Sequence, residues 1–70
     1  MELDLIYTIP EAAKILKTNV NFVYELIKAG HLKTLKIGRL KIRRITLEKF
    51  IEEHEGFDLT DPFNIKKLEN

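Results

Sequence analysis

A short capped helix that runs directly into a basic hairpin constrains the fold of this chain more than any other feature. Residues 19–30 begin with Asn19, a good helix N-cap, and end with Gly30, which supplies the left-handed residue that closes a helix. Residues 33–44 then carry six basic residues and no acidic one. Their apolar residues alternate with the cations on both sides of Gly38, which predicts a two-stranded hairpin, apolar on one face and cationic on the other.

Two further helices and a short strand surround this unit. Thr8 and Glu11 form the T-x-x-E pattern of a capping box, and Pro10 fits the first turn that follows it. Thr46 is the predicted cap of the last helix, and residues 5–8 are apolar enough for an edge strand. The predicted helices cover residues 9–17, 20–29 and 47–55.

Spacings of three and four give each helix one apolar side. The core is predicted to contain Ala12, Ala13, Ile15, Leu16, Val23, Leu26, Ile27, Leu47, Phe50 and Ile51. In the second helix the opposite stripe, Asn21, Tyr24 and Lys28, is free to contact another molecule.

Two helices joined by a three-residue break, a hairpin and a further helix follow the order of a winged helix-turn-helix. The predicted class is therefore α+β, mainly α, with three helices and a two-stranded β-hairpin wing.

Length and charge limit the organisation further. Seventy residues form one small domain, and the absence of cysteine leaves the core without disulfides or a thiolate zinc site. Residues 1–45 hold nine basic and four acidic residues, a balance of +5, whereas residues 46–70 hold three and seven, a balance of −4. This segregation predicts one face for a polyanion and another that faces water or a basic partner.

We predict a winged helix-turn-helix domain over residues 1–55 and a C-terminal tail, partly ordered or disordered, over residues 56–70. A single helical turn opened by Asp61 and Pro62 is the element considered for that tail. The N-terminus lacks the basic start and long apolar run of a signal peptide, and no apolar stretch could span a bilayer. A cytoplasmic protein that does not contact membranes is therefore expected.

Catalytic and metal-binding roles find little support in the sequence. His31 and His54 lie in different elements without cysteines or clustered carboxylates nearby, so we interpret them as surface histidines. Glu48, Glu52 and Glu55 form a solvated helix stripe without a nucleophile motif or a glycine-rich phosphate loop. We expect no enzyme, cofactor, metal ion or small-molecule ligand.

Three runs of the chain, YTIPEAAKIL, NFVYELIKAGHLKTLKIGR and IRRITLEKFI, resemble the excisionase-type helix-turn-helix domains related to the MerR superfamily. The resemblance covers about residues 7–53, and its most specific part is VYELIKAGHL followed by IGR. It implies a bacterial, phage or mobile-element protein that binds double-stranded DNA with its second helix in the major groove. The wing would lie on the backbone or in the minor groove. Between Gly38 and Ile42 the chain is one residue shorter than the commoner family pattern, which implies a tighter wing tip.

The resemblance also implies which residues contact DNA. Asn21, Tyr24 and Lys28 match the groove-facing side of the family's recognition helix, and Arg39 and Lys41 match its wing. Asn21 is either a base reader, since Asn can pair bidentately with adenine, or a plain surface residue. The complete predicted set is Asn19, Val20, Asn21, Tyr24, Glu25 and Lys28 in the helix, with Lys33, Lys36, Arg39, Lys41, Arg43 and Arg44 in the wing and its flank.

The functional prediction is a sequence-specific DNA-binding excisionase, a recombination directionality factor that acts with a tyrosine integrase in the bacterial cytoplasm, on the nucleoid. One such module buries little surface, so further copies on DNA or the integrase are expected to assist it. A small MerR-like transcription regulator remains an alternative. Another is a protein-interaction adaptor, in which the tail docks onto a partner through Phe57, Leu59, Phe63, Ile65 and Leu68.

Overall fold

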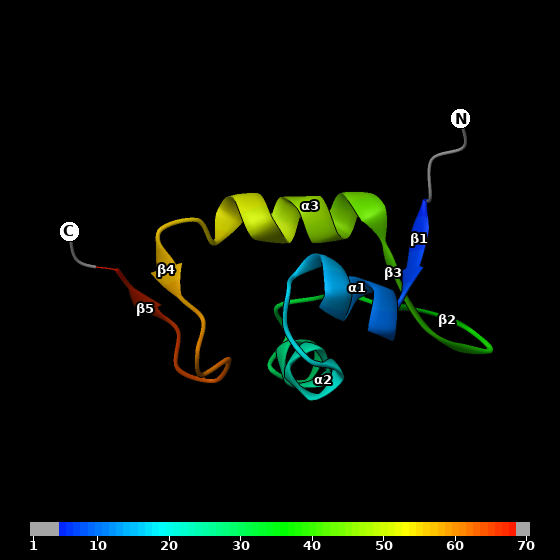
Figure 1. The fold of residues 1–70 in the computed structure, drawn as a ribbon, viewed down its shortest axis with the longest axis horizontal. Helices are drawn as coiled ribbons and strands as arrows, with labels where there is room; N and C mark the ends of the chain where they lie inside the picture. Colours follow the sequence, from blue (N-terminus) through cyan, green and yellow to red (C-terminus); the bar gives the residue numbers. More distant parts are fainter. Residues whose placement is uncertain (1–4, 69–70) are drawn as a thin grey trace.

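The computed structural model describes residues 5–68 and contains the predicted winged helix-turn-helix architecture (Figure 1). The elements in chain order are β1 (Ile6–Thr8), α1 (Ile9–Ile15), α2 (Val20–Lys28), β2 (Leu35–Ile37), β3 (Arg39–Arg43), α3 (Arg44–Glu53), β4 (Phe57–Asp58) and β5 (Lys66–Lys67). In Figure 1, α1 lies between α3 and α2, and the β2–β3 turn projects at one end of the long axis. The hairpin of β4 and β5 lies at the other end. No helix within residues 5–68 is long and apolar enough to cross a membrane.

The capping box at the start of α1 is confirmed. The Glu11 amide donates to the Thr8 hydroxyl at 3.2 Å, and the Thr8 amide donates to the Glu11 carboxylate at 2.8 Å. The helix ends at Ile15, two residues earlier than predicted, because Lys17 takes a left-handed conformation with φ of 57°. The Thr18 amide then donates back to the Ala13 carbonyl at 2.9 Å, which is the bond of a Schellman motif.

Both predicted ends of α2 are confirmed to within one residue. The Asn19 carboxamide oxygen accepts from the Phe22 amide at 2.8 Å, so Asn19 is the N-cap. At the other end Gly30 has φ of +87°, and the amide of His31 donates to the Leu26 carbonyl at 2.9 Å. A residue with a side chain would be strained at this glycine, so α2 has a fixed length and a fixed exit direction.

The predicted start of α3 is wrong. Strand β3 passes directly into the helix at Arg44, which places Thr46 inside the first turn instead of at the cap. The Arg44 amide donates to the Leu5 carbonyl at 2.9 Å, so a bond to the chain beside β1 satisfies this helical amide in place of a capping side chain. The helix ends at Glu53 and not at residue 55.

The strands β1, β3 and β2 form an antiparallel sheet in that order, which confirms the predicted edge strand. In its register, Ile37 is the partner of Arg39 and Leu35 is the partner of Lys41. Directly opposed residues share a face of a sheet, so both aliphatic residues lie on the cationic face. The predicted separation into an apolar face and a cationic face is therefore wrong. The cause is the turn, where Gly38 alone separates the paired residues and sets which positions share a face.

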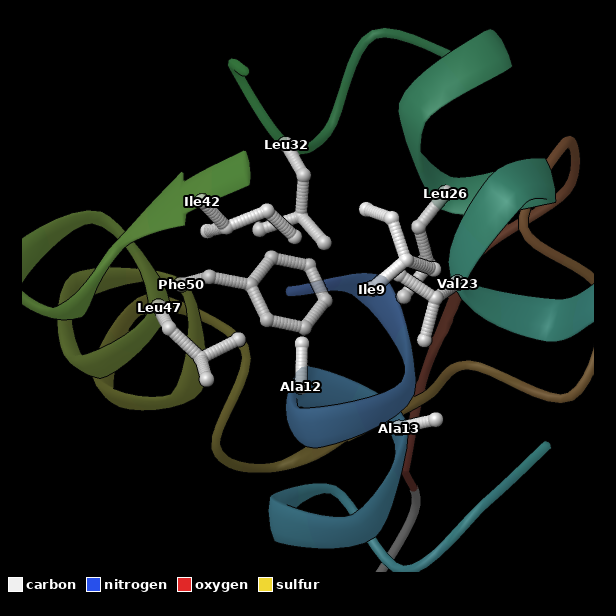
Figure 2. Packing of buried hydrophobic residues seen from close by; sticks show 9 residues of the cluster. All are labelled: Ile9, Ala12, Ala13, Val23, Leu26, Leu32, Ile42, Leu47 and Phe50. Atoms are coloured by element: carbon white, nitrogen blue, oxygen red, sulfur yellow. The ribbon is translucent and has the colours of Figure 1, made fainter. Parts of the chain in front are cut away.

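The core draws on all three helices, on β3 and on the loop after α2, as Figure 2 shows. Its buried residues are Ile9, Ala12, Ala13, Val23, Leu26, Leu32, Ile42, Leu47 and Phe50. Two predicted core residues are exposed instead, Ile15 at 43% and Ile51 at 45%. Ile51 follows the buried Phe50 and is therefore turned by about 100° around the helix, away from a core this small.

The described part of the C-terminal tail is a β-hairpin that folds back on the domain. Strands β4 and β5 pair antiparallel, and Leu59 packs against the core. Asp61 accepts from the amide of Phe63 at 3.0 Å and begins a turn, so the helical turn considered for this position is wrong. His31 and His54, interpreted as separate surface residues, lie together beside this hairpin with ring centroids 5.7 Å apart.

Candidate nucleic-acid interface

One side of α2 is available for contact with another molecule. Val23 and Leu26 are fully buried on the side that faces the core. On the opposite side Asn21, Glu25 and Lys28 are exposed, and Tyr24 is 47% exposed. The two sides differ because the helix is amphipathic: its apolar stripe packs in the core, and its polar stripe is exposed to solvent.

Two of the predicted helix residues have structural contacts. Asn19 uses its carboxamide oxygen to cap α2, which leaves its amide nitrogen as the group that could reach a ligand. Val20 is half-buried and packs against the core. The exposed stripe is therefore centred on Asn21, Tyr24 and Lys28.

The wing presents cations from β3. Arg39 is exposed, and Lys41 is half-buried, with its Nζ donating to the Ile37 carbonyl at 3.4 Å. Lys36 is also exposed, but it pairs with Leu40 and therefore lies on the opposite face of the sheet. The charge of the wing is thus divided between its two faces.

The exposed stripe of α2, which we call the recognition stripe, meets the wing at one hollow, where Tyr24 is its contribution. Val20 and Tyr24 of α2 line it together with Arg39 and Lys41 of β3, and the start of α1 forms another part of its wall. We call this the helix–wing hollow, and its volume is about 350 Å³. Residues that are separated by fifteen or more positions in the sequence therefore form one continuous surface.

Besides Lys28 and Lys36, three further predicted cations lie outside the helix–wing hollow. Lys33 and Arg43 line another hollow, beside Lys49 and Glu53 of α3. Arg44 forms an ion pair with Glu48, with 2.6 Å between Nε and Oε1. These three side chains flank the surface and do not belong to its centre.

Negative charge is concentrated away from this surface. The exposed glutamates of α3 lie across α1 from α2 in Figure 1. Two acids belong to this side of the molecule: Glu25 is exposed on α2, and Glu11 lies in the first turn of α1. The pKa of Glu11 is lowered chiefly by the hydrogen bond from the Thr8 amide and to a smaller extent by the charge of Lys41. The helix–wing side of the molecule therefore keeps a positive balance that suits a polyanion.

Sequence reasoning missed Ile37 and Leu35 as members of the cationic face. The length of the turn could have revealed them. With Gly38 as its one residue, position 37 pairs with position 39, and paired residues lie on the same face of the sheet. Within residues 5–68, no group of three or more His, Asp or Glu side chains is placed to hold a metal ion. His31 and His54 instead bond to the carbonyls of Pro62 and Phe50.

Comparison with known proteins identifies the family. A family model described as a helix-turn-helix domain matches residues 6–55, which contain β1 to α3. Neither the curated proteins nor the solved structures give a match. Domains of this kind bind DNA and place the second helix in the major groove, so the family indicates a DNA-binding, non-enzymatic role. Over residues 6–55, the chain belongs to an excisionase-type helix-turn-helix domain family.

Proposed function

We propose that this DNA-binding protein is an excisionase, a recombination directionality factor that acts with a tyrosine integrase of a phage or mobile element. The observation that carries the proposal is the helix–wing hollow, where Tyr24 of α2 and Arg39 of β3 line one surface. Helix α2 can then enter the major groove of a DNA duplex while the wing contacts the neighbouring backbone.

The individual roles follow from side-chain chemistry. In this proposal Asn21 pairs with adenine, and Tyr24 contacts a phosphate with its hydroxyl. Lys28, Arg39 and Lys41 contact phosphates and supply the sequence-independent part of the affinity. Val20 and Glu25 are assigned to base edges, Val20 by apolar contact with a thymine methyl group and Glu25 by accepting from cytosine. The remaining predicted residues contact the DNA around the centre of this surface. They are Asn19, through its amide nitrogen, and Lys33, Lys36, Arg43 and Arg44.

We also propose that the domain acts in the bacterial cytoplasm and that a partner protein assists its binding to DNA. A single module of this size buries less surface than most specific DNA-binding proteins, which favours further copies or the integrase as partners. In this proposal residues 1–55 form the DNA-binding unit, and residues 56–70 support it. The hairpin fold and the burial of Pro62 support a structural role for the tail instead of an adaptor role.

The test is a titration against the attachment-site DNA of the protein's own element and against a scrambled duplex, each at two salt concentrations. We expect preference for the native site and a steep salt dependence. Addition of the protein to purified integrase should then favour excision over integration. Site-specific binding without any effect on recombination would support a transcription regulator, and failure to bind either duplex would overturn the proposal.

A further inference from the structure

The tip of the wing carries an aliphatic side chain in an unusual place. Ile37 is the last residue of β2 and is 60% exposed, next to the turn that projects from the body (Figure 1). An isolated aliphatic side chain on a surface needs no explanation by itself. At this position, however, the residue directly across the turn, Arg39, and the next residue on the same face of β3, Lys41, are both basic.

The register and one hydrogen bond define the surroundings of Ile37. Arg39 lies directly across the turn on the same face, and the Nζ of Lys41 donates to the Ile37 carbonyl at 3.4 Å. The sequence contains no acidic residue from position 33 to position 44. The apolar side chain therefore lies between two cations. Their positive charge favours a polyanion over another protein as the ligand of this tip.

The turn itself is narrow. Gly38 alone separates Ile37 from Arg39, with φ of +73°. Among the described residues, nothing lies within 4 Å of the position that a Cβ on this glycine would take. A one-residue turn with an exposed aliphatic side chain and flanking cations is the part of the wing suited to the minor groove, which is about 6 Å wide in B-DNA and bordered by phosphates.

We propose that Ile37 is an apolar wedge that enters the minor groove and partly unstacks one base step, while Arg39 and Lys41 hold the flanking phosphates. This inference rests on the proposed DNA-binding function and adds a bending mechanism to it. Aliphatic wedges of this kind kink duplexes by about 20–90° toward the major groove. Flexible pyrimidine–purine steps at the wing position would then be favoured without any hydrogen bond to a base.

A second aliphatic residue on the same strand and face provides a matched control. Leu35 is 38% exposed and lies two residues further from the tip. It lines a hollow of about 580 Å³ with Ile6 and Ile45 and thus belongs to the body of the molecule. If Ile37 acts because of its place at the tip, the same substitution at Leu35 will leave the DNA geometry unchanged.

The experiment compares Ile37→Thr, Ile37→Val and Leu35→Thr on a duplex that contains the native site. Fluorescence transfer between labelled ends measures bending, and 2-aminopurine placed at successive steps reports unstacking. We expect Ile37→Thr to lose most of the bend, the 2-aminopurine signal and the preference for a flexible step at the wing position. The preference at the bases that α2 contacts should be retained because α2 is unaltered, and the salt slope should be retained because no charge has changed. Ile37→Val and Leu35→Thr should behave like the unmodified protein.

Three results would overturn the wedge. The first is an Ile37→Thr variant that bends and unstacks DNA as the unmodified protein does, and the second is an equal loss in Leu35→Thr. The third is an unmodified protein that binds its site specifically but leaves the duplex straight, which would leave the proposed function intact. Absence of specific binding by the unmodified protein would remove both proposals. Thermal unfolding verifies that the variants are folded, as expected for an exposed position.

Discussion

The Nε2 atom of His31 lies 2.6 Å from the carbonyl oxygen of Pro62, thirty-one residues further along the chain. Pro62 is buried, and the His31 ring also meets the edge of His54, whose Nδ1 lies 2.8 Å from the Phe50 carbonyl. These contacts join the loop after α2, the end of α3 and the turn of the C-terminal hairpin. The tail therefore contributes to the folded state of the domain.

Removal of this connection should destabilise the protein. His31→Ala leaves the Pro62 carbonyl without its donor, and we expect a loss of about 1–3 kcal/mol in the free energy of unfolding. Truncation after residue 55 should also lower the melting temperature, because the packing of Leu59 on the core is lost as well. Urea titration followed by circular dichroism measures both. Unchanged stability combined with loss of a protein partner would favour the adaptor.

The core should respond steeply to truncation of its central side chains. Leu26 is fully buried, so Leu26→Ala is expected to cost about 2–5 kcal/mol of unfolding free energy. Ile15→Ala, at a residue that is 43% exposed, should cost less than half as much. Urea unfolding of the two variants compares them directly, and equal losses would show that Ile15 is buried in solution.

The capping box should make stability depend on acidic pH. The pKa of Glu11 in the folded state lies below its ordinary value of 4.5, chiefly because its carboxylate accepts from the Thr8 amide. This contribution is present above the ordinary pKa and is lost as the pH falls through the lowered one. Glu11→Gln should therefore flatten the stability curve below about pH 4.5. Glu52→Gln, the same charge change on the exposed side of α3, is the control and should leave the acid limb unchanged.

The wing cations should account for part of the salt dependence of DNA binding. If Arg39 and Lys41 each contact one phosphate, the double Ala variant should reduce the slope of log K against log salt by about 1.8. Affinity should fall for specific and scrambled duplexes alike. Lys67→Ala, in β5 at the opposite end of the long axis from the wing tip, is the control, and its slope should match that of the unmodified protein. A slope that does not change in the double variant would remove the wing from the interface.

The recognition stripe should carry the sequence preference. Asn21→Ala is expected to cost about 1–3 kcal/mol at a single base pair and to relax specificity there. A panel of duplexes with each position of the site varied in turn measures this effect. A uniform loss of affinity for all sequences would instead identify Asn21 as a phosphate contact.

Features that depend on a few neighbouring residues could be predicted from the sequence. The capping box at Thr8, the N-cap at Asn19 and the glycine that ends α2 were all correctly assigned. Each is a contact between groups within five positions of one another, so local propensity and spacing are sufficient to determine it. The exposed stripe of α2 follows from the same kind of pattern, because helical periodicity separates the two sides of the helix.

The tertiary structure decided whatever depends on a partner far along the chain. The hydrogen bond from the Arg44 amide to the Leu5 carbonyl lets α3 begin earlier than predicted. The turn at Gly38 pairs Ile37 with Arg39 on the cationic face. Packing of the tail brought His31 to His54, and packing of both α2 and β3 on α1 brought Tyr24 and Arg39 to the same hollow. The sequence by itself determined the three helices, the strands β1 to β3 and the helix ends that local contacts define. Strand register and long-range packing alone determined which of their side chains share a surface, because those contacts form only when distant segments meet.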